Sequence, residues 1–383
     1  MRSRVNWKAL TALLGGSVLL LSGCGNAAPA SSPNGSFDAP SYFQGKTIRV
    51  IVSHDAGGGS DLAARAFAAS LGNFVPGHPR VTVTNNPGMS GIKDALDAPE
   101  ADLVLGMTSL GANLYQPILD PENTYDPKEV QIIGAVSPEP RGALVAGDFA
   151  ATYPKLIDAS GKTAAPIRFA AVVGGPADVI SEAMTAPWVC EHLKLPCDMI
   201  PVAGDTSADT ELMLQRGEVN SNFTAIGAIS RSHRDSITDR SGYVAFTYDD
   251  TGSKITYPEG MTVPPELADL LPTDAKDEWE SIQPLVTGGG LGKTFWMGPS
   301  APTGVVDALR QAWADFTKDP ALYGPFEKSQ EGGGSEGGIS FDITPIPGAD
   351  GQKLYDASTE TFLSNRDAYT KLQTELYDKY WAK

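Results

Sequence analysis

Two glycine-rich turns are the parts of this sequence best suited to hold an anion. The first, residues 54–61 (HDAGGGSD), follows a β-branched run typical of a strand and precedes an alanine-rich stretch with helical spacing. The second, residues 173–178 (VGGPAD), also follows an apolar run. The free amide N–H groups of a first helical turn converge, and glycine lets a ligand approach them closely. Each turn is therefore predicted to bind a carboxylate or phosphate without needing Arg or Lys.

A tight strand-to-helix turn that binds nothing would have the same local pattern. The occurrence of two such turns favours binding, because turns on opposite sides of a cleft could hold both ends of one ligand. The pair of turns therefore predicts a ligand with two anionic groups.

Three patterns that would indicate catalysis or metal binding fail on inspection. Residues 288–294 resemble a phosphate-binding P-loop, but Thr287 stands where that pattern needs glycine. Residues 333–337 match G-x-S-x-G, yet they lie in a glycine-rich stretch and not at a strand-to-helix turn. The four histidines are scattered without metal-binding spacing. We therefore expect no enzyme, no cofactor and no metal.

Composition and charge exclude further classes of protein. The chain has 383 residues, 41% hydrophobic and 20% charged, which is ordinary for a globular protein and long enough for two domains. Its formal charge is −17. A chain this acidic lacks the basic surface that nucleic acids attract, so no nucleic-acid partner is expected.

The N-terminus has the pattern of an export signal followed by a lipid attachment site. A basic start leads into an apolar run that is too short to span a bilayer and ends in LSGC. This ending resembles a bacterial lipobox, in which Cys24 is lipidated; the alternative is a plain signal peptide and a coincidental cysteine. We predict a lipoprotein signal peptide over residues 1–23 and a flexible tether over 24–41. The folded part is then extracytoplasmic and anchored to the bacterial cell membrane.

The two remaining cysteines, Cys190 and Cys197, favour a small disulfide loop, because an even number of cysteines in an oxidising compartment usually pairs. Free thiols and a metal site that includes His192 are the alternatives.

Hydrophobic periodicity predicts alternating strands and helices, and therefore an α/β fold with mostly parallel sheets. Strands are expected at 47–52, 80–84, 102–107, 168–173 and 243–248, and helices at 62–71, 178–184, 208–216, 305–318 and along the C-terminus as one long amphipathic helix. Ser60 or Asp61 is the expected N-cap of the first helix. Residues 251–287 and 331–338 are expected to be loops.

Five motifs, in order along the chain, resemble those of tripartite tricarboxylate transporter receptors (the Bug family). They are the opening strand and glycine turn (GKTIRVIV and GGGSDLAAR), VTNNPGMSG at 83–91, ADLVLGMTS at 101–109, VAG with ELMLQRGEVN at 202–220, and PSAPTGVV at 299–306. The resemblance implies a type II periplasmic-binding-protein-like fold with two α/β lobes, a ligand cleft and two chain crossovers. Lobe 1 would comprise residues 42–137 and 249–383, and lobe 2 residues 138–248.

The resemblance also implies a function. The protein is expected to be a monomeric solute receptor that binds a small di- or tricarboxylate, aromatic ones included, and delivers it to the membrane subunits of a secondary transporter. Ligand sensing for a sensor kinase is one alternative. An exported hydrolase that uses Ser60, His54 and Asp61 is another.

The residues implied to bind the ligand lie in the two turns and at three strand-end positions. They are His54, Asp55, Ala56, Gly57, Gly58, Gly59, Ser60, Asp61, Thr108, Ser109, Val173, Gly174, Gly175, Pro176, Ala177, Asp178 and Thr224. His54 and Asp55 depart from the apolar approach of the family. Because Asp55 would repel a carboxylate, we expect either a ligand that also carries an amine or hydroxyl, or an Asp55 that faces solvent.

Overall fold

The computed structural model describes residues 37–108, 114, 126–202, 208–249, 253–330 and 338–382. Asp38–Lys383 form one compact unit, to which all the helices and strands of the chain's described part belong. The predicted signal peptide, Cys24, most of the tether, Ser109 and the G-x-S-x-G stretch lie outside the described residues.

A six-stranded sheet with the order β13-β4-β11-β3-β1-β2 forms the first layer of the unit. Its strands are β1 (Thr47–Val52), β2 (Arg80–Asn85), β3 (Leu103–Thr108), β4 (Gln131–Val136), β11 (Thr294–Met297) and β13 (Pro345–Pro347). β1 is parallel to β2 and β3, but β11 is antiparallel to both β3 and β4. The prediction of mostly parallel sheets is therefore wrong. The sheets are mixed because β11 returns from far along the chain, and the local pattern does not encode that pairing.

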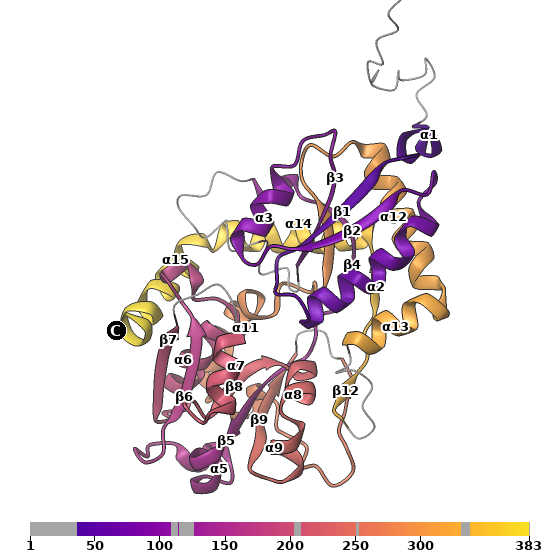
Figure 1. Cartoon of the computed structure of the whole chain (residues 1–383). Helices are drawn as coiled ribbons and strands as arrows, with labels where there is room; N and C mark the ends of the chain where they lie inside the picture. The colour runs from indigo at the N-terminus through magenta and orange to yellow at the C-terminus, as the bar shows by residue number, and fades with distance from the viewer. Residues whose placement is uncertain are drawn as a thin grey trace, which may run out of the picture. The chain divides into compact units, whose positions relative to one another are not determined.

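Helices cover both faces of this sheet (Figure 1). α2 (Gly59–Phe74), α12 (Thr303–Lys318) and α13 (Pro320–Gln330) share one apolar cluster, in which the ring of Phe67 lies 4.6 Å from Phe295 and 5.1 Å from Trp313, centre to centre. α3 (Met89–Leu96) and α14 (Gly348–Ser364) contribute to the cluster on the other face, and α1 (Ala39–Phe43) precedes β1.

A second group of strands follows β4 through the linker at 137–140. β5 (Arg141–Ala146) lies between β8 (Ser221–Ala225) and β9 (Gly242–Tyr248) in an antiparallel sheet. β6 (Ile167–Val172) and β7 (Cys197–Val202) form a parallel pair. The Asn220 amide N–H donates to the Arg168 carbonyl over 3.1 Å, which joins that pair to the start of β8. β10 (Ile255–Thr256) pairs with β12 (Ser340–Phe341).

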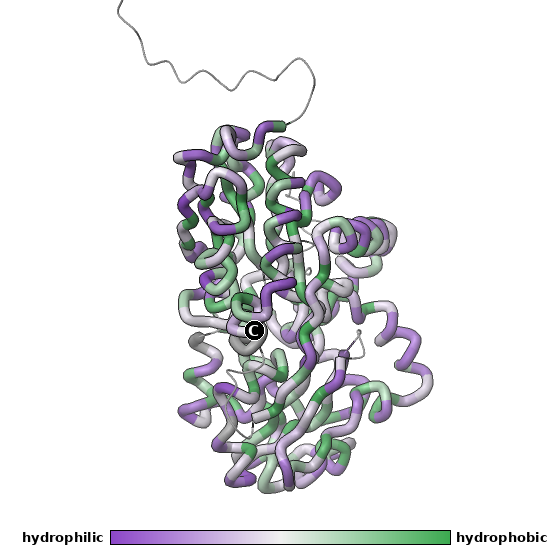
Figure 2. The backbone as a smooth tube through the Cα atoms, turned by 90° about the vertical axis from the view of Figure 1, so that its right-hand side faces the viewer, coloured by the Kyte–Doolittle hydropathy of each residue, from purple (hydrophilic) through white to green (hydrophobic). Residues whose placement is uncertain are grey.

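The remaining helices surround these strands. They are α5 (Gly147–Thr152), α6 (Ser181–His192), α7 (Ala208–Gln215), α8 (Ile226–Ser232), α9 (Arg234–Thr238), α10 (Leu267–Leu270), α11 (Thr273–Thr287) and α15 (Arg366–Leu376), with short 3-10 turns η1 (Pro127–Glu129), η2 (Leu156–Ala159) and η3 (Pro176–Asp178) and the π-turn η4 (Tyr377–Trp381). Hydrophilic residues recur along the outward-facing parts of the chain, as Figure 2 shows.

Two predictions about helices are wrong. The predicted loop at 251–287 contains α11, which buries Trp279, Ile282 and Leu285 at helical spacing. The predicted single C-terminal helix is two helices, because α14 ends with Asn365 as its C-cap and α15 starts at the next residue.

α11 and α15 both contact α6. The indole N–H of Trp381 donates to the Ala183 carbonyl over 3.2 Å and ties the end of the chain to that helix. Residues 288–293 then connect α11 to β11 beside the first linker, since the Gly292 amide donates to the Val136 carbonyl over 2.8 Å. The lobe boundaries expected from the sequence stay a prediction.

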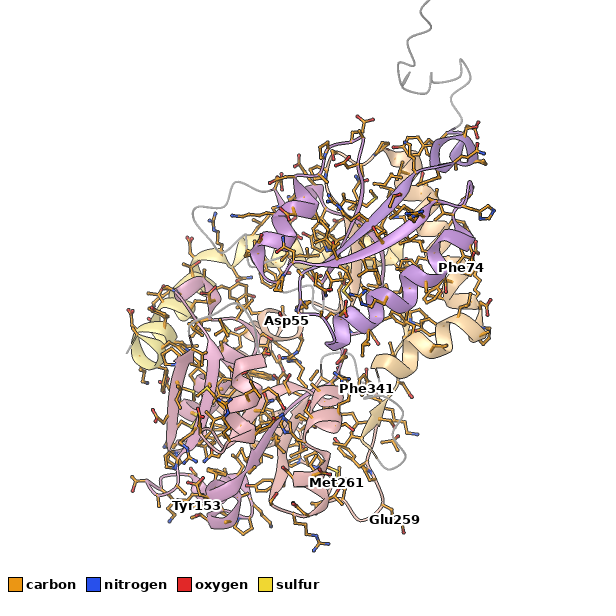
Figure 3. The ribbon with its side chains drawn as sticks, viewed as in Figure 1. Asp55, Phe74, Tyr153, Glu259, Met261 and Phe341 are labelled. Atoms are coloured by element: carbon orange, nitrogen blue, oxygen red, sulfur yellow. A yellow bond between two sulfur atoms is a disulfide. The ribbon has the colours of Figure 1, made fainter. Side chains whose placement is uncertain are left out.

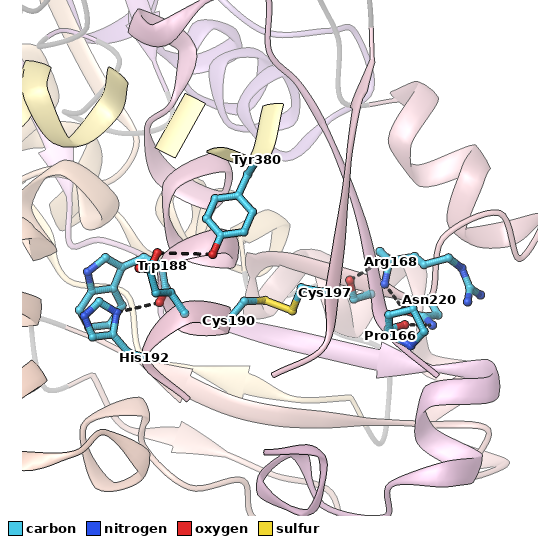
Figure 4. Close-up of a disulfide and its surroundings, with 10 residues drawn as sticks. Pro166, Arg168, Trp188, Cys190, His192, Cys197, Asn220 and Tyr380 are labelled. Atoms are coloured by element: carbon cyan, nitrogen blue, oxygen red, sulfur yellow. Dashed lines mark hydrogen bonds between the residues drawn. A yellow bond between two sulfur atoms is a disulfide. The ribbon is translucent and has the colours of Figure 1, made fainter. Parts of the chain in front are cut away.

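The predicted disulfide is confirmed (Figure 4). Cys190, in the last turn of α6, is bonded to Cys197, the first residue of β7, with their Cα atoms 6.3 Å apart. Within the described residues, no group of His, Cys, Asp and Glu side chains has the arrangement of a metal site, and no helix is both long and apolar enough to cross a membrane.

Candidate ligand-binding site

The first glycine turn leaves β1 at the edge where β3 also ends. The Ser53 amide and hydroxyl both donate to the Met107 carbonyl, over 3.1 and 3.2 Å, and so hold the exit of β1 against β3. Gly57 has a φ of 85°, a conformation that favours glycine. α2 begins at Gly59 with Gly58 as its N-cap, so the predicted caps Ser60 and Asp61 are wrong by two or three residues.

Asp61 holds this turn in shape from inside the first turn of α2. Its carboxylate accepts hydrogen bonds from the Gly57 amide over 2.8 Å, from Arg65 Nε over 3.0 Å and from Asn85 Nδ2 over 3.0 Å. Burial alone would raise the pKa of Asp61, but these hydrogen bonds outweigh burial and lower the pKa below its usual value. Since Asn85 Nδ2 also donates to the His54 carbonyl over 3.0 Å, the whole turn is fastened to β2.

Two cationic side chains reach the N-terminus of α2. A Cβ added to Gly59 would lie 3.3 Å from Nη2 of Arg231 and 3.9 Å from Cε of Lys293. Arg231 lies in the last turn of α8, is exposed, and forms no ion pair with any described residue. Lys293 precedes β11, is buried, and forms an ion pair with the buried Glu139 of the first linker. The glycine turn is therefore not a purely backbone anion site.

A second ion pair lies beside the first. Arg141 Nη2 is 2.8 Å from Glu182 Oε2, and Arg141 Nε donates to the Tyr248 hydroxyl over 3.4 Å. Burial would lower the pKa of Arg141, but Glu182, Tyr248 and Glu139 raise it, so its guanidinium stays charged. Glu182 belongs to the first turn of α6, which follows the second glycine turn.

His54 is half-buried and feels the charge of one member of each ion pair, Lys293 and Glu182. Burial first, and the charge of Lys293 second, lower the pKa of His54 to about 4, although the charge of Glu182 acts in the opposite direction. The imidazole is therefore neutral at pH 7 and can both donate and accept a hydrogen bond. Figure 3 labels Asp55, the next residue, on the loop that connects β1 to α2.

The second glycine turn differs from the predicted anion cradle. Its amides at Gly174 and Gly175 donate to the Asp178 carboxylate, over 2.8 and 3.0 Å. The predicted helix from 178 onward instead starts at Ser181, after the short turn η3. The side chain of Gln373 on α15 donates to the Val179 carbonyl over 3.2 Å and holds the turn from behind. A carboxylate of this chain thus occupies these amides in this structure.

The predicted site residues differ in accessibility. The exposed residues are Ala56, Gly57, Gly58, Gly174 and Pro176. The half-buried residues are His54, Asp55, Gly59, Gly175, Ala177, Asp178 and Thr224. The buried residues are Ser60, Asp61, Thr108 and Val173. The Thr108 hydroxyl, at the end of β3, has no hydrogen-bond partner in the described part of the chain. Thr224 lies on β8 opposite Gly142 of β5. The ligand-binding role of these residues stays a prediction.

This geometry does not support the hydrolase alternative. A catalytic triad needs its acid to orient the histidine. The hydrogen-bond partners of the Asp61 carboxylate are Gly57, Arg65 and Asn85, and the ring of His54 is not among them.

Solved structures of solute-binding proteins are similar to this chain. A TctC solute-binding protein from Polaromonas has 16% sequence identity and a TM-score of 0.54, and the match covers 86% of this chain and 98% of that chain. The chain has the fold of a periplasmic solute-binding protein. MatC from Rhodopseudomonas palustris, solved with malate, has 13% identity and a TM-score of 0.54, over 85% of this chain and 99% of that one. A further R. palustris protein, solved with adipate, has 14% identity and a TM-score of 0.56, over 86% and 97%.

The solute-binding fold confirms the fold class expected from the sequence motifs. No model of a protein family matches the sequence, and no curated protein sequence matches it. At these identities the likeness to TctC and MatC is one of fold.

Sequence reasoning about this solute-binding fold misses five charged residues beside the first turn. They are Glu139, Arg141, Glu182, Arg231 and Lys293. In the sequence, Lys293 is notable only as the lysine of the incomplete P-loop pattern at 288–294. The other four have no local signal, because each is an ordinary charged residue in its own segment and the fold brings it to the site.

Proposed function

We propose that this protein is an extracytoplasmic solute receptor, anchored to the bacterial cell membrane through a lipid on Cys24. It binds a small carboxylate as a monomer and delivers it to the membrane subunits of a tripartite tricarboxylate-type transporter. The observation that carries the proposal is the approach of the Arg231 guanidinium to Gly59, at the N-terminus of α2.

This arrangement suits a carboxylate for three physical reasons. The first turn of α2 carries the positive end of the helix dipole, and its N-cap Gly58 has no side chain to satisfy the free amides. Glycine leaves room for a ligand beside the backbone. The exposed guanidinium of Arg231 can grip a carboxylate through two parallel hydrogen bonds. MatC and the adipate-bound R. palustris protein, which share the fold, each hold a dicarboxylate.

The same arrangement accounts for ligand-driven closure. α2 follows β1 of the six-stranded sheet, and α8 follows β8 of the antiparallel sheet. A carboxylate that contacts both Gly59 and Arg231 binds best when these two helices are close together. The ligand therefore favours the closed state in proportion to its differential affinity for the two states.

The test of ligand binding is thermal unfolding of the purified protein against mono-, di- and tricarboxylates. A ligand at 100 times its Kd stabilises the folded state by about 2.7 kcal/mol, which is a measurable shift in Tm. Arg231→Gln should abolish that shift. Arg366→Gln is the matched control, because Arg366 is exposed and forms no ion pair with a described residue. An unshifted Tm with every carboxylate would contradict the proposal.

The membrane anchor of the protein and its role as a transport receptor need separate measurements. Mass spectrometry of the N-terminal peptide should find a lipid on Cys24 that is absent in Cys24→Ser, and fractionation should move that variant away from the membrane. Uptake of the labelled ligand should fall in cells that lack the receptor. Hydrolysis of a carboxylic ester by the purified protein would favour the hydrolase alternative instead.

A further inference from the structure

The charges beside the first glycine turn are already balanced in pairs. Lys293 is neutralised by Glu139, and Arg141 by Glu182, and three of these four side chains are buried. A buried cation that is paired in this way is not available as a counter-charge for a ligand, since the ligand would have to compete with a partner already in contact. Arg231 is the cation at Gly59 that has no described acidic partner.

Two cations approach Gly59 among the described residues, and one of them, Lys293, is paired with Glu139. The positive charge that they leave available at the turn is the guanidinium of Arg231, which acts together with the N-terminal dipole of α2.

Glu182 is an acidic group near the turn. Its side chain is 37% exposed, and only its Oε2 is engaged with Arg141. The charges of Lys293 and Glu182 both act on His54, whose ring is neutral at pH 7. The carboxylate of Glu182 favours an uncharged hydrogen-bond donor over a second carboxylate, which it would repel.

We infer that the site selects a ligand with one net negative charge, a monocarboxylate whose other end carries an uncharged hydroxyl or amide group, over the corresponding dicarboxylate. This inference rests on the proposed function and specifies its ligand. The carboxylate lies at Gly59 and Arg231, and the uncharged end lies towards His54 and Glu182, where an N–H or O–H can donate to the carboxylate of Glu182.

Isothermal titration at pH 8 and low salt tests the inference with ligands of the same carbon chain length that differ in the charge of one end. One set is adipate, adipic acid monoamide and 6-aminohexanoate; a shorter set is succinate, succinic acid monoamide and 4-aminobutyrate. Within the set that fits the site, the monoamide should bind at least tenfold more tightly than the diacid and the amino acid.

Two substitutions make the test independent of ligand size. Glu182→Gln removes one negative charge and releases Arg141, so the preference should shift at least tenfold towards the diacid. Glu182→Asp keeps the charge and should keep the preference for the monoamide. Glu280→Gln, an exposed position on α11, is the charge-matched control and should change nothing. A cooperative thermal transition without ligand establishes that each variant is folded. A lower Tm is expected for Glu182→Gln, because it leaves the buried Arg141 without its charged partner.

The outcomes separate the two proposals. Diacid binding that equals or exceeds monoamide binding would overturn the charge inference and leave the receptor function standing. Preference for the amino acid, or a preference unaffected by Glu182→Gln, would overturn it as well. Binding of no carboxylate in either set, with the protein folded, would overturn the receptor function and the inference together.

Discussion

The guanidinium of Arg231 lies against Gly59, so close that a Cβ on Gly59 would come within 3.3 Å of Nη2. The two residues belong to helices that follow strands of different sheets, α8 after β8 and α2 after β1. A helix N-terminus and a cation on facing elements form a site whose affinity depends on how closely the elements approach. This relationship links the fold to ligand binding and leads to the first of four predictions.

Gly59→Val should weaken carboxylate binding by at least tenfold with little change in Tm. The branched side chain would push Arg231 away and cover the free amides of α2, while a first-turn position tolerates a side chain. Titration calorimetry measures the affinity. Gly324→Val is the control, because a Cβ there meets nothing within 4 Å. Equal affinities of Gly59→Val and the wild type would contradict a ligand at this helix end.

Asp61→Asn should lower the free energy of unfolding by about 1 to 3 kcal/mol at pH 7, because a buried acceptor with several charge-assisted hydrogen bonds loses its charge. The pKa of Asp61 is lowered in the folded state, so its contribution is present above the unfolded pKa of about 3.9 and is lost as the pH falls through the folded pKa. Urea unfolding should show that the difference in free energy of unfolding between the variant and the wild type is smaller at pH 3 than at pH 7. Asp307→Asn, at an exposed site on α12, should have the same free energy of unfolding as the wild type at both pH values.

His54 should make the protein less stable in mild acid. Its folded pKa of about 4 lies below the unfolded value of about 6.5, so between these values the unfolded chain binds the extra proton. The contribution of the neutral ring is complete above pH 6.5 and is lost as the pH falls towards 4, by about 1 to 3 kcal/mol. Urea unfolding from pH 4 to pH 7.5 should give a flatter profile for His54→Gln. If the free energies of unfolding of His54→Gln and the wild type change with pH in parallel, the ring of His54 is not desolvated.

Loss of the disulfide should destabilise the protein by about 2 to 3 kcal/mol, because the bond closes a loop with a sequence separation of 7. Cys190→Ser combined with Cys197→Ser should lower Tm, and a reductant should lower the Tm of the wild type to the same value. Ligand affinity serves as the control, since the disulfide joins α6 to β7 away from Gly59. A Tm insensitive to reductant would mean that the thiols are free.

Several parts of the fold could be predicted because their signals are local. The run at 47–52 is β-branched, and it forms β1 with those bounds. The Cys190–Cys197 bond follows from an even pair of nearby cysteines. α11 shows that the prediction could have gone further, since Trp279, Ile282 and Leu285 have helical spacing. Pro284 and the acidic residues of α11 obscured that spacing.

The backbone part of the candidate site could be predicted from the sequence, but its side-chain contacts could not. The turn at 54–61 is a strand, glycines and a helix start in sequence, so the N-terminus of α2 is visible from local pattern. The same reasoning predicts the second turn, but the sequence does not reveal that Asp178 accepts its two amides. A side chain four residues on can occupy a turn as well as a ligand can, and local pattern does not distinguish the two.

The sequence by itself determined strands β1, β2, β3, β6 and β9, helices α2, α7 and α12, the disulfide and the first glycine turn, because apolar spacing and glycine conformation act over a few residues. Only the tertiary structure decided which charges meet there. Glu139 and Lys293 are 154 residues apart in sequence and form an ion pair because two connecting segments run side by side. Arg231 reaches Gly59 although α8 and α2 follow strands of different sheets. Electrostatic contacts depend on distance in space, which the long-range pairing of the strands sets.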